Sequence, residues 1–215
     1  MGKIKKRIIA LLTIMLILIT GVSISGCMPP DFTGPKLTEE QATEYIKDLV
    51  EKSYDINVIV FGKGLPHLEE RDPDYPQYAP VLENEKYNRI NDIKLAIRKI
   101  YSKSYAESIE NVAFRGSESG IEGTTLFPRY IENEAGELLI LVDDIVLDYE
   151  SGEYGKYEGI SVQKYDPSTV EIIKISNRFV EANVKSYDKT TTIKVTLIKQ
   201  EVNGEYEWRL NSSTC

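Results

Sequence analysis

The sequence contains few of the residues that build disulfide frameworks, metal sites and catalytic triads. Its 215 residues include two cysteines, Cys27 and Cys215, and one histidine, His67. Two cysteines provide neither a disulfide framework nor a cysteine-rich metal site. A single histidine, with no partnering cysteine and no nucleophile-elbow glycine pattern, completes no zinc site and no catalytic triad. Glycine-rich phosphate-binding motifs are also absent, so we predict no catalytic residue, no metal and no cofactor.

The N-terminal residues have the layout of a secretory signal. Three lysines and Arg7 precede an apolar run at residues 8–19, which is the arrangement of a signal peptide. Counted on to Gly26, the run is also about long enough to span a bilayer, so a single membrane helix stays open as an alternative. Pro29 and Pro30 follow closely and cannot continue a helix, which favours the signal peptide.

The end of this run, Ile24-Ser25-Gly26-Cys27, resembles the bacterial lipobox. In that motif small residues fit the signal peptidase, and the cysteine thiol accepts a diacylglycerol. Two acyl chains such as palmitate are sufficient for stable anchoring. We therefore predict a lipoprotein signal peptide at residues 1–26 and a lipid on Cys27. The protein is then held at the extracytoplasmic face of a bacterial cell membrane.

Negative charge predominates in the rest of the chain. The full sequence has 26 lysines and arginines against 34 aspartates and glutamates, and residues 27–215 keep 22 against 34, a net charge of −12. Such a charge argues against nucleic acid as a partner and against docking on anionic lipid. It suits a cationic partner or the cell wall, although solubility alone would also explain it.

Folding is predicted to start after a short tether. Residues 27–36 include three prolines and a glycine, which is typical of a stiff linker, and residues 37–215 suffice for a single domain. Thr38 and Gln41 form a capping-box pattern in front of a helical apolar face. A β-branched strand is predicted at residues 56–61. Two further helices are predicted at residues 92–102, capped by Asn91, and at residues 104–110, capped by Ser104.

Strand periodicity begins at Val112, and a run of hairpins follows. Residues 129–132 and 137–142 flank a turn that contains glycine, a hairpin pattern. Asn203-Gly204 supplies the positive φ angles of a second tight turn. The remaining predicted strands are residues 161–163, 169–175, 178–187, 191–199 and 205–210. Helices early and hairpin-linked strands late predict an α+β fold, with two or three N-terminal helices packed on a mostly antiparallel sheet in one lobe or two.

Two acidic, tyrosine-bearing segments are candidate recognition loops. Residues 67–85 contain three prolines and directly follow a fourth, Pro66; these exclude a helix there, and loops of this length are often functional or disordered. Tyrosine offers rigid contact area with a polar tip. The candidate recognition residues are Glu69, Glu70, Asp72, Asp74, Tyr75 and Tyr78 in the first segment and Tyr149, Tyr154 and Tyr157 in the second. A plain mobile loop stays open as the alternative.

The remaining carboxylates give no specific signal. Asp143 and Asp144 end a predicted strand, and three glutamates follow in residues 150–158. The spacing lacks the D-x-D-x-D-G series of a calcium loop. A glycosidase pair would need a set separation across a cleft, which spacing along the chain does not reveal. We therefore interpret these groups as solvated surface.

The middle of the chain resembles a family of small Gram-positive surface proteins. The similarity lies in Tyr87-Asn88-Arg89-Ile90-Asn91-Asp92-Ile93, Ala96-Ile97-Arg98-Lys99-Ile100-Tyr101, Tyr105-Ala106, Pro128-Arg129-Tyr130-Ile131 and the closing Glu207-Trp208-Arg209-Leu210-Asn211-Ser212-Ser213-Thr214. The nearest named group is the DL-endopeptidase inhibitor family, which the chain resembles over residues 37–214. The resemblance implies a two-lobed α+β fold and a blocking loop. It further implies a non-catalytic protein that restrains the cysteine peptidases which trim cell-wall stem peptides.

The sequence thus favours a lipid-anchored, non-catalytic binding or inhibitory module at the cell envelope. Its partners would be the membrane, through the N-terminal lipid, and a cell-wall enzyme or envelope protein. Two alternatives stay open. One is a pocket-containing α+β protein, either a small-ligand carrier or an enzyme, with His67, Asp143 or Asp144 lining the pocket. The other is a structural subunit of the envelope.

Overall fold

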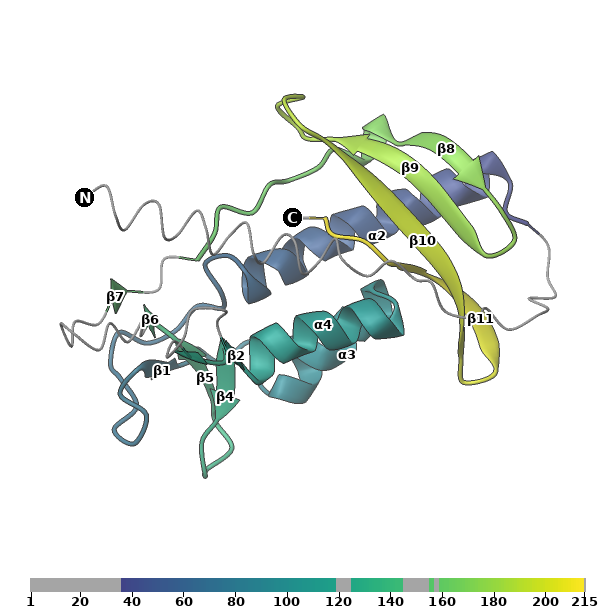
Figure 1. The fold of residues 1–215 in the computed structure, drawn as a ribbon. Coiled ribbons are helices and arrows are strands. Elements are labelled where there is room, and N and C mark those ends of the chain that lie inside the picture. The colour runs from purple at the N-terminus through teal and green to yellow at the C-terminus, as the bar shows by residue number, and fades with distance from the viewer. Residues whose placement is uncertain (1–35, 119–124, 145–154, 157–158, 215) are drawn as a thin grey trace. The chain divides into compact units, whose positions relative to one another are not determined.

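Three α-helices and two antiparallel sheets, of three and four strands, make up most of the described chain (Figure 1). The structure is a computed structural model. It describes residues 36–118, 125–144, 155–156 and 159–214, and Lys36–Cys215 group into one compact unit. The predicted α+β class is confirmed.

Helix α2 spans Glu39–Val60 and begins with the predicted capping box. The Gln41 backbone N–H donates to Thr38 Oγ1 (3.2 Å), and the Thr38 N–H donates to Gln41 Oε1 (3.0 Å). The predicted strand at residues 56–61 is wrong, because the helix continues through residue 60. The β-branched side chains of Ile56, Ile59 and Val60 fall on the buried face, where burial outweighs their modest cost in helix propensity. That face consists of Ala42, Ile46, Leu49, Val50, Ser53, Ile56, Asn57, Ile59 and Val60.

Helix α3 spans Ile90–Ile100 and starts two residues before the predicted helix at residues 92–102. The Asp92 carboxylate accepts the backbone N–H of Arg89 (3.0 Å) and so binds a donor that the helix itself leaves unpaired. The predicted cap at Asn91 is therefore wrong, since that residue lies inside the first turn.

Helix α4 spans Lys103–Phe114 and is longer than the predicted helix at residues 104–110. Ser102, not Ser104, is its N-cap, with a hydroxyl that accepts an N–H of the first turn (3.4 Å). The predicted change to strand periodicity at Val112 falls inside this helix and is wrong.

The three-stranded sheet has the order β1-β5-β4, with β1 at Tyr78–Pro80, β4 at Tyr130–Glu132 and β5 at Leu138–Leu141. Strands β4 and β5 form the predicted hairpin, and Gly136 in its turn has a φ of +77°. Strand β1 lies in residues 67–85, which the sequence did not predict to contain a strand. Two short ladders pair β2 (Ser117–Glu118) with β3 (Thr125–Leu126) and β6 (Asp143–Asp144) with β7 (Gly155–Lys156).

The four-stranded sheet has the order β11-β10-β9-β8 and confirms the four C-terminal strand predictions. Its strands are β8 (Glu171–Ile175), β9 (Phe179–Lys185), β10 (Thr192–Val202) and β11 (Glu205–Leu210), and a 3-10 turn, η1 (Pro167–Thr169), precedes them. Asn203 and Gly204 have φ angles of +54° and +86°, as the predicted tight turn requires. Residues 161–163 form no strand, so that prediction is wrong.

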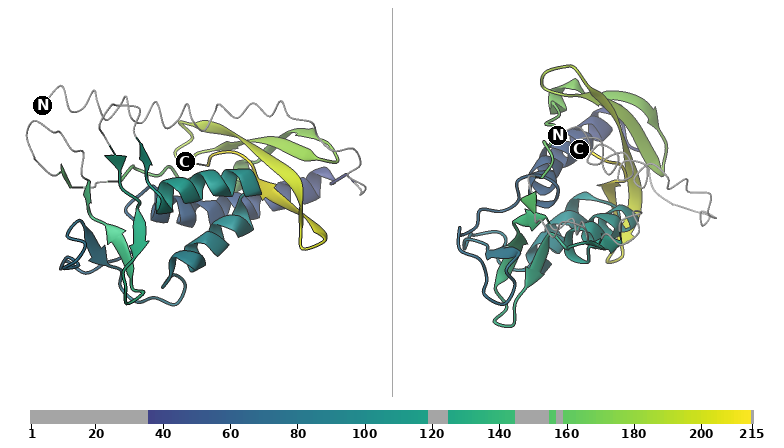
Figure 2. Two further views of the ribbon diagram at one scale, coloured as in Figure 1. Left: turned by 60° about the horizontal axis from the view of Figure 1, so that its bottom comes forward. Right: turned by 60° about the vertical axis from the view of Figure 1, so that its left-hand side comes forward.

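Helix α2 packs along the four-stranded sheet and reaches the small sheet with its C-terminal end. Figures 1 and 2 show the small sheet near the C-terminal end of α2 and the four-stranded sheet beside its N-terminal half. The hydroxyl of Tyr130 in β4 donates to Ile59 O (2.9 Å) and accepts the Leu65 N–H (3.0 Å). These bonds fix the small sheet to the end of the helix. The four-stranded sheet buries Val180, Ala182, Val184, Val195, Leu197, Trp208 and Leu210.

A buried polar cluster joins the helices to the last residues of the described chain. The Tyr101 hydroxyl lies 3.0 Å from Asn57 Oδ1 and 2.9 Å from Thr214 Oγ1, and Asn57 Nδ2 donates to Thr214 Oγ1 (2.9 Å). Beside it, Ser102 Oγ donates to Asn211 Oδ1 (2.5 Å). Buried polar groups are costly unless paired, so this cluster secures the C-terminal segment against α2 and α4.

Candidate functional site: an acidic loop on the small sheet

The first candidate loop, residues 67–77, is closed at its base by a short antiparallel ladder. The Leu68 N–H donates to Pro80 O and the Leu82 N–H donates to Pro66 O, both at 2.9 Å. His67 and Val81 form the bridge between these two bonds. The loop therefore begins and ends on the edge of the small sheet.

Asp72 organises the turn at the tip of the loop. This aspartate is 5% exposed, and its Oδ1 accepts the backbone N–H groups of Asp74 (2.9 Å) and Tyr75 (3.0 Å). Its Oδ2 accepts from Nδ2 of Asn133, in the β4–β5 turn, at 3.2 Å. An aspartate that bonds the backbone two and three residues on fixes a turn. Asp72, predicted as a recognition residue, is a buried support.

Tyr78 and Tyr75 lie against the small sheet and form part of a small hydrophobic core. Tyr78 in β1 is 3% exposed and clusters with Leu139 and Leu141 of β5, and Tyr75 packs against this cluster. The Tyr78 hydroxyl donates to Pro128 O (2.9 Å), and burial raises the pKa of Tyr78. Tyr78, predicted to take part in recognition, is a core residue. The sequence did not indicate this burial because it did not predict strand β1, which contains Tyr78.

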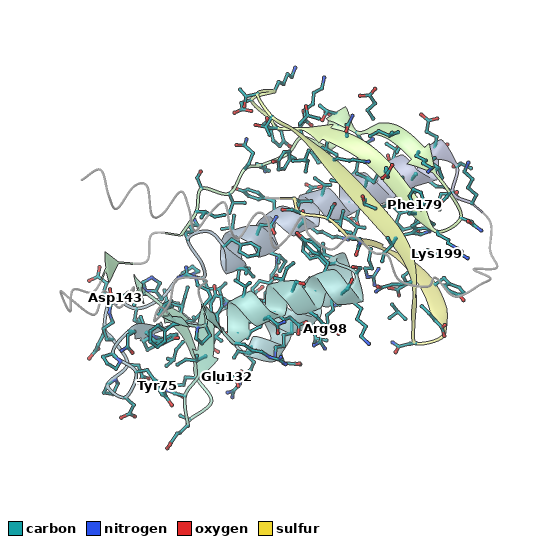
Figure 3. All side chains as sticks on the ribbon, viewed as in Figure 1. Tyr75, Arg98, Glu132, Asp143, Phe179 and Lys199 are labelled. Carbon is teal, nitrogen blue, oxygen red and sulfur yellow. The ribbon has the colours of Figure 1, made fainter. Side chains whose placement is uncertain are left out.

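An ion pair ties the loop to β6, just beyond β5. Arg71 Nε and Nη2 each lie 3.3 Å from a carboxylate oxygen of Asp143, and both side chains are about one third exposed. Exposed pairs contribute at most about 1 kcal/mol, so this contact orients the loop more than it stabilises the fold. Figure 3 places Tyr75 and Asp143 together at this end of the molecule, far from Phe179 and Lys199 on the four-stranded sheet.

Three predicted recognition residues are left at the surface. Glu69, Glu70 and Asp74 are exposed, on a loop in which Asp72 and Arg71 are engaged with Asn133 and Asp143. Carboxylates are acceptor groups with negative charge. The arrangement therefore suits recognition of cationic or hydrogen-bond-donating surfaces.

His67 is exposed, and its Nδ1 lies 2.8 Å from Leu68 O. A carbonyl oxygen only accepts, so Nδ1 carries the proton in this contact. Among the described residues, no group of three histidine, cysteine, aspartate or glutamate side chains is arranged to hold a metal ion. Asp143, a second residue considered for a pocket, is engaged with Arg71 instead of with His67. The side chain of Asp144, the third, lies outside the described part of the structure.

Several predicted residues lie outside the described ranges. These are Cys27 and Cys215, the second candidate loop with Tyr149, Tyr154 and Tyr157, and three of the acidic residues near it, Glu150, Glu153 and Glu158. None of the described helices is both long enough and apolar enough to cross a membrane.

The supporting residues of the loop were missed at the sequence level. Asn133 was interpreted as part of a turn, and Arg71 was not singled out. Both act across gaps of more than 60 residues, toward Asp72 and Asp143. The one local signal was Asp72 itself, because an aspartate before Pro73 is typical of a turn.

Comparison with protein-family models and with curated proteins finds no match for the chain.

Proposed function

We propose that the protein is a lipid-anchored, non-catalytic binding module of the bacterial cell envelope, and that its loop at residues 67–77 binds and restrains a cell-wall peptidase. One observation carries the proposal. Glu69, Glu70 and Asp74 are exposed on a loop that Asp72 and Arg71 hold against the small sheet. A preorganised loop loses little conformational entropy on binding, which favours affinity.

The lipid anchor rests on the lipobox-like sequence that ends at Cys27. Cys27→Ala is expected to abolish acyl labelling of the full chain and to leave an unprocessed precursor. Metabolic labelling with a fatty acid, followed by gel analysis, measures both effects. A variant that is still acylated would contradict the anchor while leaving the loop proposal intact.

The binding role is tested with a cysteine peptidase that cleaves cell-wall stem peptides. Its rate of digestion of purified cell wall is measured with and without soluble residues 28–215, which include the whole compact unit. We expect a dose-dependent fall in rate. No change at micromolar excess would refute the restraint of this peptidase class.

A matched pair of variants separates the loop from general acidity. Replacing Glu69, Glu70 and Asp74 by their amides should weaken the inhibition. Replacing three exposed glutamates of the four-stranded sheet by glutamine removes the same charge at a distance and should leave the inhibition unchanged. These control positions are Glu171, Glu201 and Glu205. Equal loss in both variants would indicate a non-specific effect of net charge.

A further inference from the structure

Two leucines stand exposed side by side at the base of the loop. Leu68 and Leu82 each expose 44% of their surface. The ladder pairs Leu68 with Pro80 and Leu82 with Pro66, and His67 with Val81 between them. Residues directly opposite each other in an antiparallel pair point to the same face, and so do residues two apart. Leu68 and Leu82 are therefore diagonal neighbours on one face.

This face continues the small hydrophobic core of Tyr78, Leu139 and Leu141. Pro80 lies opposite Leu139, and Tyr78 lies opposite Leu141, so all four share the face that carries the two leucines. Leu139 and Leu141 are buried, whereas the leucines at the ladder are not. Leu68 and Leu82 therefore form the exposed edge of this packed hydrophobic cluster, and the ladder fixes their backbone.

Exposed carboxylates lie close along the chain to this apolar edge. Residues 66–85 contain six carboxylates, of which all but Asp72 are exposed, and one arginine; that arginine, Arg71, is paired with Asp143. Glu69 and Glu83 directly follow the two leucines and are exposed. An apolar centre with a charged rim is typical of a protein–protein interface. The sign of the rim selects a basic partner, because like charges disfavour both an anionic bilayer and a second copy of this face.

We propose that Leu68 and Leu82 form the apolar centre of a docking surface for a basic protein, with Glu69, Glu70 and Glu83 as its rim. The inference rests on the proposed function, since the docked protein is the restrained cell-wall enzyme. The leucines supply the buried contact, and the rim supplies orientation and a fast, salt-dependent approach. An apolar centre with an acidic rim is complementary to an enzyme whose surface presents lysine or arginine around an apolar depression.

Photocrosslinking of the full chain in the producing bacterium tests the surface directly. A benzophenone amino acid is placed at Leu68, at Leu82 or at Leu95. Leu95 in α3 is 48% exposed and serves as the matched control. We expect a discrete covalent product from the first two positions and none from the third. Mass spectrometry should identify the captured protein as an envelope protein with a basic surface.

Charge-reversal variants complete the test of the rim. Glu69→Lys with Glu70→Lys should reduce the product by about tenfold or more, whereas Glu201→Lys with Glu205→Lys should leave it unchanged. Absence of a specific product at Leu68 and Leu82 would overturn the docking surface. So would a product that contains a second copy of this chain or an acidic protein.

The outcomes also distinguish this inference from the proposed function. Leu68→Ser with Leu82→Ser should raise the concentration needed for peptidase inhibition by about tenfold, with an unchanged thermal unfolding midpoint as the folding control. Inhibition that survives this change would refute the docking surface and leave the restraint of the peptidase standing. A basic crosslinked protein without peptidase activity would refute the restraint of the peptidase and leave the docking surface standing.

Discussion

Asp72 offers the sharpest test of the claim that the loop is held in a fixed conformation. Asp72→Ala removes a 5% exposed carboxylate that accepts three hydrogen bonds, two from the backbone of Asp74 and Tyr75 and one from Asn133. A hydrogen bond to a charged group contributes about 1.5–3 kcal/mol, and bonds that share one side chain are not additive. We therefore expect a loss of about 3 kcal/mol. For a domain of this size that corresponds to a fall of about 6–12 °C in the unfolding midpoint.

The assay combines calorimetry with amide hydrogen exchange on residues 28–215. Exchange at Asp74 and Tyr75 should accelerate strongly in Asp72→Ala, because their acceptor is gone. Asp72→Asn keeps one acceptor oxygen for the two backbone groups, so it should cost only about 1 kcal/mol. An Asp72→Ala protein with an unchanged midpoint and unchanged exchange at both amides would refute the fixed loop.

Two further predictions concern contacts away from the loop. Tyr101→Phe removes the hydroxyl that lies between Asn57 and Thr214 and should cost about 1–3 kcal/mol in urea unfolding; a cost below about 0.3 kcal/mol would contradict the role of the buried cluster. Glu110→Gln breaks a two-point contact with Arg98, at 2.6 and 2.8 Å, in which the hydrogen bond and charge of Glu110 raise the pKa of Arg98. Because Arg98 is largely exposed, the expected cost is only about 0.5–1 kcal/mol, and it should shrink in high salt; an effect independent of salt would point to packing instead.

The sequence predicted the elements whose signals are local. Strand β9 and the middle of β10 alternate buried and half-buried residues, and Asn203-Gly204 carries its own turn geometry, so these strands were found. The strand prediction at residues 56–61 was wrong because β-branched residues followed by Gly62 suit a strand locally. Only the partners of Ile56 and Val60 decide in favour of a helix. Tertiary packing of this kind leaves no mark in a short window of sequence.

The candidate loop was found from composition, but its conformation was not. Prolines and carboxylates mark residues 67–85 as irregular, and Glu69 and Glu70 are at the surface. Strand β1 was missed because its three residues pair with β5, about 60 positions later. The same distance along the chain separates Asp72 from Asn133. Which of the acidic and aromatic residues would be buried was therefore undetermined by the sequence.

The length of α2 fixes a distance within the molecule. Its 22 residues rise about 1.5 Å each, so the helix measures about 33 Å, close to the hydrocarbon thickness of a bilayer. Leu65 and Tyr130 lock the base of the acidic loop to its far end. The helix therefore sets the reach between its own first turn, at Glu39, and the base of the loop at about one helix length. Removing seven residues, two turns of the helix, would shorten that reach by about 10 Å.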